Sequence, residues 1–537
     1  MPTLPENKTS SRLEWLAAGF VSVAIVWLHF HFWRNAGGLW RDEVNLVNLA
    51  SSPSLAAMTH DSFPVLMPLL VKIWTSLGVS DAWLRLLGFC AGLAIPAAFW
   101  AVARATRRPP LFSLVLFALN SLLICYGDSL RGYGIGSALI VFALAAMWFF
   151  LKNPTWRRGG IVALAATLSV QALYQNALLF FAICLGGFAV CARQKNFSAA
   201  QKIFCAGVVA AMSLLPYYAS LATLPQAAVE LRRGFSPFIT SLNFEMATGF
   251  PFAGFTSVWK ILAVLTIAFA LFSLRRPPPP ETSEQGLLPL FAGVTLAAVA
   301  ALFIGFLWFA AVAVRPWYFL PPLALTAACF DFGISLSLLP RLVRTAAFGI
   351  LIGTVLISLT YDQSDLRGHF TNVDRLAARV TAEAAPQDFV VVTPWFCGIS
   401  FARYFHGPTA WETLPPLTDH RTHRYDLMLA QMQNTNALTP VLEKISATLR
   451  TGHRVWIVGL MDMPAPNAGE PQVLPPPPLP DSGWSDTAYT GSWAARTAFF
   501  LSRYGESFQP VSTDDQQLYF QENLHLLMAQ GWKTNAP

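Results

Sequence analysis

The chain has 537 residues, of which 54% are hydrophobic and 12% charged, whereas a soluble globular protein is about 25% charged. This composition excludes an ordinary soluble protein and indicates an integral membrane protein. The net charge of +7 does not indicate nucleic-acid binding, because Lys and Arg stand in short clusters between apolar runs, and no nucleic acid is expected as a partner.

The chain begins with Lys8 and Arg12 ahead of an apolar run, residues 14–33. This run is longer than the apolar core of a signal peptide and lacks a small-residue cleavage site, so we expect an uncleaved first span. Further runs of spanning length predict about eleven transmembrane helices; they lie at 86–104, 110–126, 133–151, 159–174, 177–192, 203–221, 257–274, 286–311, 318–338 and 345–360.

Basic residues occur in alternate connections between these runs, which predicts a cytoplasmic N-terminus and cytoplasmic basic loops. Residues 63–79 are also apolar, but a span there would place Arg104, Arg107 and Arg108 on the opposite side and invert every later loop. We therefore interpret 63–79, which contains Pro64 and Pro68, as an interfacial or re-entrant helix. The first outward loop then covers residues 34–85, and a second outward loop covers 222–256.

The composition changes after residue 361, where the chain becomes charged, rich in proline and no longer apolar. Runs of β-branched and aromatic residues predict strands at 389–393, 454–459 and 517–521, with a helical stretch around 424–450. We therefore predict a membrane domain over 1–361, with the active site in loop 34–85, and a soluble α/β domain over 362–537. An odd number of spans places that domain outside the cytoplasm.

Two adjacent carboxylates, Asp42 and Glu43, open the first outward loop. They fit three interpretations from the residues alone: solvated interface residues, a cap for the helix that follows, or a catalytic pair. The same loop carries a second polar cluster, His60 and Asp61, ahead of Pro64.

The order of motifs resembles the GT-C glycosyltransferases, in particular the protein O-mannosyltransferases and the lipid A aminoarabinose transferases, of the glycosyltransferase family 39 type. The resemblance covers roughly residues 14–360, and its motifs are Asp42-Glu43, Asp61-x-x-Pro64-x-x-x-Pro68, Trp74-x-x-x-Gly78-x-x-Asp81-x-x-x-Arg85, Asp128-Ser-Leu-Arg131-Gly-Tyr133 and Arg315-Pro-Trp-Tyr318.

This resemblance implies a sugar donor carried on a polyprenyl phosphate and an inverting transfer to an acceptor hydroxyl on the exported face of the membrane. An acceptor hydroxyl is a poor nucleophile at neutral pH, so a carboxylate must take its proton during attack. We assign that role to Asp42 and expect Glu43 to orient the acceptor. Like-charge proximity would raise the pKa of one member of such a pair.

The leaving group is a lipid phosphate, which cations at the outward membrane surface would stabilise. Arg131 and Arg315 are the candidates, with Tyr133 and Tyr318 as hydrogen-bond donors. The alternative is that these are arginines and tyrosines of an ordinary membrane interface. His60, Asp61 and Asp128 are candidate contacts to acceptor or sugar.

No cofactor is expected, and no metal site is predicted, because the acidic residues and His60 match no ligand template and the family resemblance favours a metal-independent reaction. One motif departs from the aminoarabinose transferases, which have a lysine directly before a Pro-Pro pair; Phe63-Pro64-Val65 stands here instead. The acceptor therefore stays open among glycan, lipid and protein.

Two other functions compete with transfer: a transporter of envelope glycan or lipid precursors, and a non-catalytic glycolipid-binding partner. Transporters place ionisable residues near the bilayer midplane on broken helices. The apolar runs here are almost free of charge, which favours an enzyme that works at the lipid surface. We expect a bacterial inner membrane location, with the C-terminal domain in the periplasm.

Overall fold

The computed structural model describes residues 8–54, 58, 63–219, 235–250, 254–275, 287–310, 314–334, 341–465, 468–478, 485–511 and 519–533. These residues form two compact units. The helical unit contains the described residues up to Asn35 and those from Met58 to Arg367, and the C-terminal unit contains residues 36–54 and those from Gly368 onward. Each unit is described separately below.

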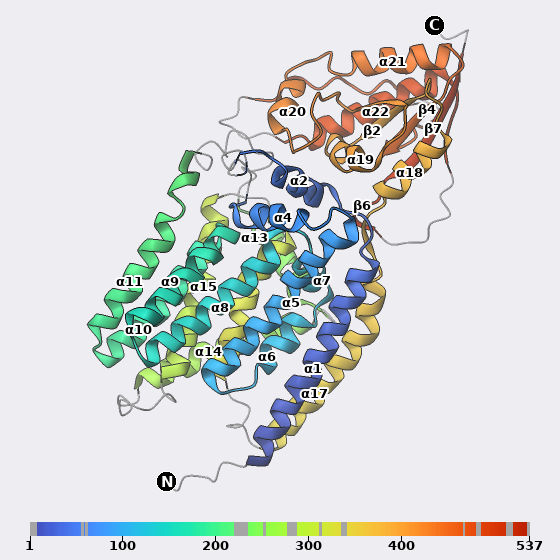
Figure 1. Ribbon diagram of the computed structural model, residues 1–537. Helices are drawn as coiled ribbons and strands as arrows, with labels where there is room; N and C mark the ends of the chain where they lie inside the picture. Colours follow the sequence, from blue (N-terminus) through green and yellow to red (C-terminus); the bar gives the residue numbers. More distant parts are fainter. Residues whose placement is uncertain are drawn as a thin grey trace. The chain divides into compact units, whose positions relative to one another are not determined.

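The helical unit is built from long helices (Figure 1). Its main members are α1 (Lys8–Asn35), α5 (Asp81–Thr106), α8 (Gly132–Lys152), α9 (Trp156–Ala172), α10 (Asn176–Gln194), α11 (Phe197–Met212), α14 (Phe255–Arg275), α15 (Leu287–Ala310), α16 (Leu320–Gly333) and α17 (Arg341–Asp365).

Seven helices in the described part of the chain are long and apolar enough to cross a membrane: α1, α5, α8, α10, α11 with the 3₁₀ turn after it, α14 and α15. The chain is therefore a multi-pass membrane protein. The other four predicted runs are also helical but are not among these seven, and within α17 only Phe348–Thr360 counts as a shorter apolar helix. Helix α9 has 17 residues and α16 has 14.

The predicted span at 110–126 is discontinuous. It consists of α6 (Leu111–Ser113), the π-helical turn η1 (Leu114–Ala118) and α7 (Ser121–Gly127). The break comes at Asn120, whose side chain accepts a hydrogen bond from the Leu123 N–H and donates one to the Ala247 carbonyl. A side chain that caps a new helix start ends the one before it.

Short helices accompany the long ones. The interpretation of 63–79 as a non-spanning segment agrees with α4 (Leu66–Thr75), whose ten residues would extend only about 15 Å against a hydrocarbon core of about 30 Å. The others are the 3₁₀ turn η2 (Leu215–Tyr217), α13 (Pro237–Thr248) in the predicted second outward loop, and the 3₁₀ turn η3 (Pro316–Phe319).

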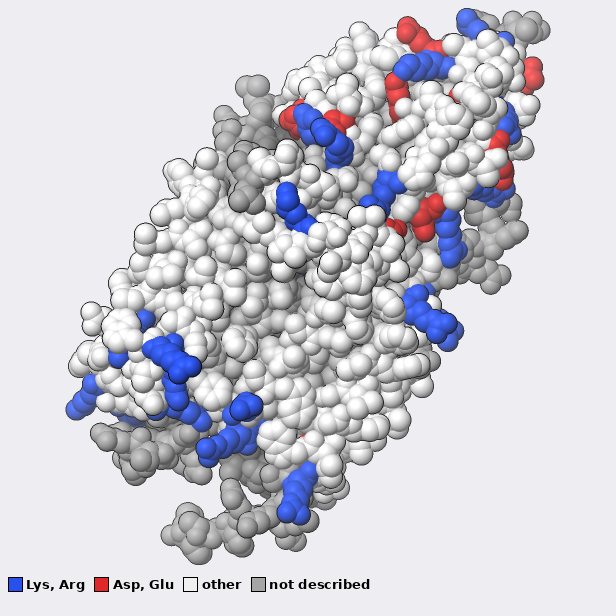
Figure 2. Space-filling view, in the orientation of Figure 1, with Lys and Arg blue, Asp and Glu red and all other residues white. Residues whose placement is uncertain are grey.

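Lys and Arg gather at the end of the helical unit where α1 begins, on the face that Figure 2 shows. Basic residues stand in the last turns of three of the long helices, with Arg104 in α5, Lys152 in α8 and Arg193 in α10. Such a bias is what the positive-inside rule predicts for the cytoplasmic side.

The C-terminal unit contains a five-stranded mixed sheet in the order β3-β2-β4-β7-β5. The strands are β2 (Phe389–Thr393), β3 (Ala410–Thr413), β4 (Val455–Gly459), β5 (Gly505–Pro510) and β7 (His525–Trp532). Strands β3, β2 and β4 are parallel, whereas β7 and β5 are antiparallel to their neighbours. The predicted α/β domain is therefore correct in class, although β6 (Tyr519–Glu522) pairs with β1 (His369–Thr371) in a separate two-stranded sheet.

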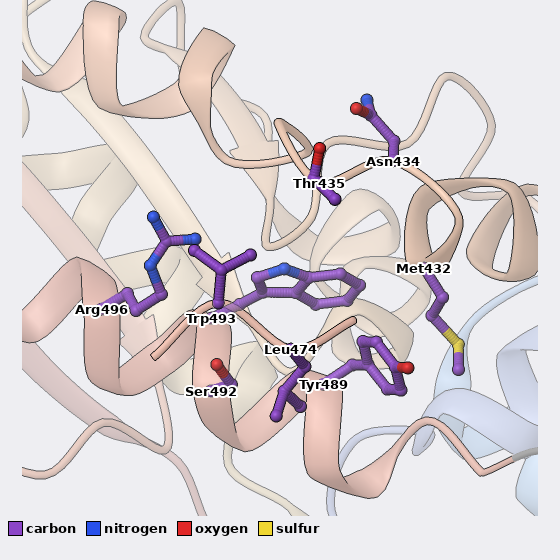
Figure 3. Close-up of a pocket in the computed structure, with 9 residues that line it drawn as sticks. Met432, Asn434, Thr435, Leu474, Tyr489, Ser492, Trp493 and Arg496 are labelled. Carbon is purple, nitrogen blue, oxygen red and sulfur yellow. The ribbon is translucent and has the colours of Figure 1, made fainter. Parts of the chain in front are cut away.

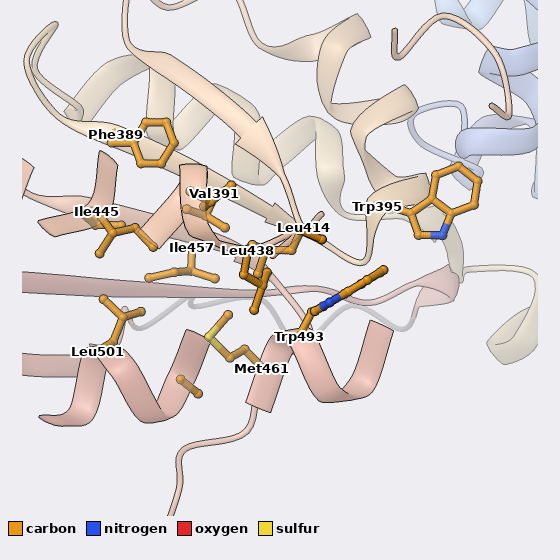
Figure 4. Packing of buried hydrophobic residues seen from close by; sticks show 14 of the residues in the cluster. Phe389, Val391, Trp395, Leu414, Leu438, Ile445, Ile457, Met461, Trp493 and Leu501 are labelled. Carbon is orange, nitrogen blue, oxygen red and sulfur yellow. The ribbon is translucent and has the colours of Figure 1, made fainter. Parts of the chain in front are cut away.

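Helices cover both faces of this sheet, because every residue of β2 and β4 is buried. On one face, Val390, Val392, Trp456 and Val458 pack against α18 (Val373–Glu383) and α19 (Gly398–Tyr404). On the other, Val391 and Ile457 pack against α20 (Tyr425–Met432), α21 (Thr439–Arg450) and α22 (Thr487–Tyr504), as Figure 4 shows for Leu438, Ile445 and Leu501.

One part of the first outward loop belongs to the C-terminal unit. Helix α2 (Arg41–Ala50) is preceded by Leu39, whose backbone N–H donates a 2.5 Å hydrogen bond to the Tyr404 hydroxyl in α19. The Trp40 and Phe370 rings stack at 6.0 Å. The division at 361/362 that the sequence predicts did not place residues 36–54 with the C-terminal residues.

Candidate functional site

Asp42 lies in the first turn of α2, where the N-terminal end of a helix favours a carboxylate. Its Oδ1 atom lies 3.2 Å from Nε2 of His423 and 3.7 Å from Nε of Arg41. The Asp42 side chain is 23% exposed, so it is held by cations or hydrogen-bond donors on one side and still reaches solvent. A carboxylate in this setting is able to accept a proton from a bound hydroxyl.

Glu43 points in a different direction from Asp42. Its side chain is fully buried, and Oε2 accepts a hydrogen bond from the Trp40 backbone N–H at 3.3 Å. This is the reach-back half of a capping box, which satisfies an N–H at the start of the helix. The structure therefore gives Glu43 the capping contact that the sequence left open as one of its interpretations.

Arg41 links α2 to two residues from later in the C-terminal unit, Glu522 and Phe396. Its backbone N–H donates to Oε1 of Glu522 at 3.2 Å, its Nη1 lies 3.7 Å from the same oxygen, and its guanidinium lies 4.3 Å above the Phe396 ring. Burial raises the pKa of Glu522, against the opposing charge of Arg41 and a hydrogen bond from Ser400. These contacts fix the first turn of α2 against β6 and the turn that follows β2.

The first turn of α2 lies at the carboxyl ends of the parallel strands. Phe396, under Arg41, lies in the short turn Trp395–Cys397 after β2, and His423, beside Asp42, lies in the loop after β3. In open α/β sheets, ligands bind in the crevice outside these strand ends. Asp42 therefore stands where this architecture ordinarily exposes functional groups.

A second group of predicted residues lies in the helical unit, around Asp128. This carboxylate is buried in the connection between α7 and α8, with Oδ1 2.6 Å from Nδ1 of His29 in α1. The Asp128 segment fits into a notch on α5: a Cβ atom added to Gly88 would lie 2.1 Å from the Asp128 carbonyl, and one added to Gly92 would lie 1.6 Å from Oδ1. Only glycine permits this approach.

The structure brings Arg131, Tyr133 and Tyr318 into one cluster around Phe63. The Arg131 guanidinium lies 4.3 Å from the Phe63 ring centre, a cation–π contact. Tyr133 meets the same ring edge-on at 5.6 Å and lies 6.4 Å from Tyr318. Arg315, at the start of η3, is exposed.

An apolar groove of about 430 Å³ adjoins this cluster through Phe319, the neighbour of Tyr318. Its lining comes from α13, α14, α15, η3 and α16, and includes Phe244, Trp259, Phe303, Leu307 and Phe319. Lys260 of α14 also lines it. A groove of this kind suits a hydrocarbon chain, with Lys260 as a cation within reach.

A further cavity in the C-terminal unit is too small for a sugar. It holds about 10 Å³ beside α22, about enough for one water molecule. Figure 3 shows Trp493 at its centre, with Tyr489, Thr435 and Arg496 around it. We assign no substrate to it.

His60 and Asp61 lie outside the described residues. Among the residues that are described, no group of three or more His, Cys, Asp and Glu side chains is placed to hold a metal ion.

Sequence reasoning missed His423, Arg41, Glu522, His29 and Lys260. For His423 the available signal was the dense run of charged and aromatic residues from Asp419 to Asp426. That signal does not indicate a contact with a residue hundreds of positions earlier.

The chain resembles solved structures only distantly in sequence. No family model matches it, and no curated protein matches it. The apo crystal structure of ArnT from Cupriavidus metallidurans is similar with a TM-score of 0.50 at 12% identity, over 82% of this chain and 93% of ArnT. The same protein bound to undecaprenyl phosphate gives 0.49 at 12% identity, over 82% and 92%.

An oligosaccharyltransferase from Archaeoglobus fulgidus, in complex with zinc and sulfate, gives a TM-score of 0.47 at 12% identity, over 82% of this chain and 68% of that one. The apo ArnT comparison shows a shared fold. The chain is therefore a multi-pass membrane protein with the GT-C fold, as the order of sequence motifs predicts.

Proposed function

We propose that the chain is a glycosyltransferase that moves a sugar from a polyprenyl-phosphate carrier to an acceptor hydroxyl, with inversion at the anomeric carbon and Asp42 as the general base. One observation carries this proposal: in a chain with the GT-C fold, Asp42 is a partly exposed carboxylate held between His423 and Arg41 at the first turn of α2. Fold likeness alone does not define a reaction, so the residues must carry the argument.

The reaction requires a base beside the acceptor hydroxyl and cations beside the leaving phosphate. As the acceptor oxygen attacks the anomeric carbon, its proton passes to Asp42 and the bond from that carbon to the phosphate oxygen breaks, leaving its electron pair on the phosphate. No covalent intermediate is needed for a single inverting displacement. In this proposal Glu43 helps to orient the acceptor indirectly, because it caps the helical turn that carries Asp42.

The donor fits the helical unit. The apolar groove takes the polyprenyl chain, and Arg131, Arg315 and Lys260 stabilise the phosphate charge as it develops, with Tyr133 and Tyr318 as hydrogen-bond donors. A polyprenyl phosphate is the chosen carrier because ArnT, whose apo form shares the fold, binds undecaprenyl phosphate. Asp128, with His60 and Asp61, contacts the sugar or the acceptor.

The proposed setting is a bacterial inner membrane, with the N-terminus in the cytoplasm and the C-terminal unit in the periplasm. The basic cluster at the end of the helical unit where α1 begins supports this orientation. The reaction is proposed to need no metal and no cofactor. The acceptor is a glycan, a lipid or a protein of the cell envelope.

The test compares wild type and Asp42→Asn in a strain that lacks the gene. Asn keeps the size of the side chain but does not accept the proton, so the transfer rate should fall by about a hundredfold to ten-thousandfold. Mass spectrometry of polyprenyl-phosphate sugars should show the same lipid-linked sugar accumulating in the deletion strain and in Asp42→Asn. The accumulated lipid would name the donor.

Glu443→Gln is the matched control, because it removes a carboxylate charge from an exposed position on α21. It should restore envelope glycans as wild type does, with equal protein in the membrane. If Asp42→Asn also restores them fully, Asp42 is not the base, and transport or glycolipid binding becomes the better explanation.

A further inference from the structure

The contact between Asp42 and His423 joins two residues that lie 381 positions apart in the sequence. The His423 ring is nearly buried, with 14% of its side chain exposed, and Nε2 faces the Asp42 carboxylate at 3.2 Å. A histidine of the C-terminal unit therefore touches the group that we propose as the base.

The orientation of the His423 ring is fixed by its neighbours. The ring stacks on Tyr425 at 5.6 Å with an interplanar angle of 13°, and it meets Trp395 edge-on at 6.3 Å. Trp395 is itself anchored by a 2.8 Å hydrogen bond from its indole N–H to Asp486. The imidazole is thus held between aromatic rings that leave it little freedom to turn.

Backbone contacts hold the loop that carries His423 against α2. The His423 N–H donates to Oδ1 of Asn45 at 3.0 Å, and the Asn48 amide donates to the Arg421 carbonyl at 2.7 Å. Both asparagines lie on α2, three and six residues after Asp42. The register between Asp42 and His423 is therefore specified by three contacts rather than one.

The tautomer follows from the surroundings. Nδ1 of His423 is buried and has no hydrogen-bond partner among the residues that the structure describes. A proton on Nδ1 would be a buried donor without an acceptor, which is costly. The proton therefore belongs on Nε2, where it is donated to Oδ1 of Asp42.

We propose that His423 is a positioning residue for the transfer. Its Nε2–H orients the Asp42 carboxylate and stabilises the ionised form that accepts the proton of the acceptor. His423 neither gains nor loses a proton in this step, since the acceptor proton ends on Asp42. The inference rests on the proposed function of Asp42.

Other charged and titratable groups lie on α2 and on the elements packed against it. On α2 these are Arg41 and Glu43; from the elements packed against it they are Cys397, Asp419, His420, Arg421, Arg424, Tyr425, Asp426, Asp486 and Glu522. Because all of them remain in His423 variants, a change in the pH profile of such a variant reports the lost imidazole.

The test uses the full-length chain in lipid nanodiscs, with polyprenyl-phosphate sugars extracted from the deletion strain as the donor and envelope extract as the acceptor. His423→Phe keeps the aromatic packing and removes the donor, whereas His423→Gln keeps an amide donor and removes the ring. Loss of a hydrogen bond to a charged group should lower kcat about 10- to 100-fold in His423→Phe. His423→Gln should lose at most about threefold, because the donor to Asp42 is restored.

The pH profile of kcat/KM separates positioning from a purely structural role. A donor to a carboxylate favours its ionised form, so removal of the donor raises the pKa of that carboxylate. The acid limb of the profile should therefore move to higher pH in His423→Phe and stay in place in His423→Gln. Thermal midpoints of both variants show whether either one is misfolded. If His423→Phe is misfolded, His423→Gln alone separates the two roles: positioning predicts that it keeps kcat, and a purely structural role predicts that it loses kcat.

The failures are distinguishable. If wild type consumes none of the lipid-linked sugars, the proposed function fails. If wild type is active and Asp42→Asn is not, the proposed function stands. The role of His423 is then overturned by either of two results: both His423 variants match wild type, or both lose kcat with an unchanged pH profile.

Discussion

Asp388 gives the sharpest stability prediction for the C-terminal unit. This carboxylate is buried at the amino ends of β2 and β4, on the strand ends opposite Phe396. Oδ1 accepts the Arg454 backbone N–H at 2.8 Å. Oδ2 accepts the Ala385 N–H at 3.0 Å, Arg454 Nε at 3.0 Å and the Trp456 indole N–H at 3.1 Å.

Asp388→Asn leaves one acceptor oxygen where the native residue has two. If that oxygen takes the Oδ2 position, the new NH2 group faces the Arg454 backbone N–H. The hydrogen bond from this N–H to the charged carboxylate, worth about 1.5–3 kcal/mol, is then lost. The weakened ion pair with Arg454, whose side chain is 31% exposed, adds less than about 1 kcal/mol. The free energy of unfolding should therefore fall by about 2–4 kcal/mol.

The assay is thermal unfolding of the full-length chain in detergent, with brief proteolysis to report opening of the C-terminal unit. A loss of this size should lower the midpoint by roughly 4–16 °C for a unit of this length. Asp462→Asn, at an exposed position, is the control and should stay within about 0.5 kcal/mol of wild type. An Asp388→Asn midpoint equal to that of Asp462→Asn would refute the reasoning.

The same carboxylate predicts a pH dependence. Burial alone would raise the pKa of Asp388, but hydrogen bonds from Arg454, Trp456 and Ala385 and the charge of Arg454 hold it below its usual value. A lowered pKa means that the stabilisation is fully present above the unfolded-state pKa of about 3.9. It is lost as pH falls through the folded-state pKa. The difference between wild type and Asp388→Asn should therefore be constant from pH 7 to 5 and shrink below about pH 4.

Three further predictions concern the proposed reaction. Gly92→Ala should disrupt the 2.6 Å contact between His29 and Asp128, because its Cβ would lie 1.6 Å from the Asp128 carboxylate. Transfer assays should show at least about a tenfold loss of rate. The control Gly19→Ala, whose Cβ meets nothing within 4 Å, should be neutral. Arg131→Gln should raise the KM for the lipid-linked donor about tenfold or more, with Arg131→Lys recovering part of the loss, as titration of the donor would reveal. Treatment with EDTA should leave the transfer rate unchanged; a loss that Mg²⁺ or Mn²⁺ restores would contradict metal independence.

The sequence predicted β2 and β4 to within one residue because both are continuous apolar runs buried on two faces. It missed β7, in which Gln530 and Gly531 interrupt the apolar pattern. Hydropathy likewise marked 110–126 as one span. An average over such a window does not register a single Asn120 that caps a new helix.

The candidate site was predictable in part. Motif order indicated Asp42, Arg131, Tyr133 and Tyr318, and the structure brings the last three together. The contact of Asp42 with His423 was not predictable, because it depends on how residues 36–54 pack within the C-terminal unit. Neither periodicity nor charge patterning relates two residues so far apart in the chain.

The adjacent carboxylates Asp42 and Glu43 do not behave as one pair. Successive residues on a helix point about 100° apart, so Asp42 faces His423 while Glu43 turns back to the Trp40 N–H. Gln at a capping-box position accepts the same hydrogen bond as Glu. Glu43→Gln should therefore keep most of the transfer rate and the thermal midpoint, whereas Asp42→Asn should lose the rate and keep the midpoint. If Glu43→Gln is as inactive as Asp42→Asn with an unchanged midpoint, the Glu43 charge takes part in the reaction and capping is not its main role.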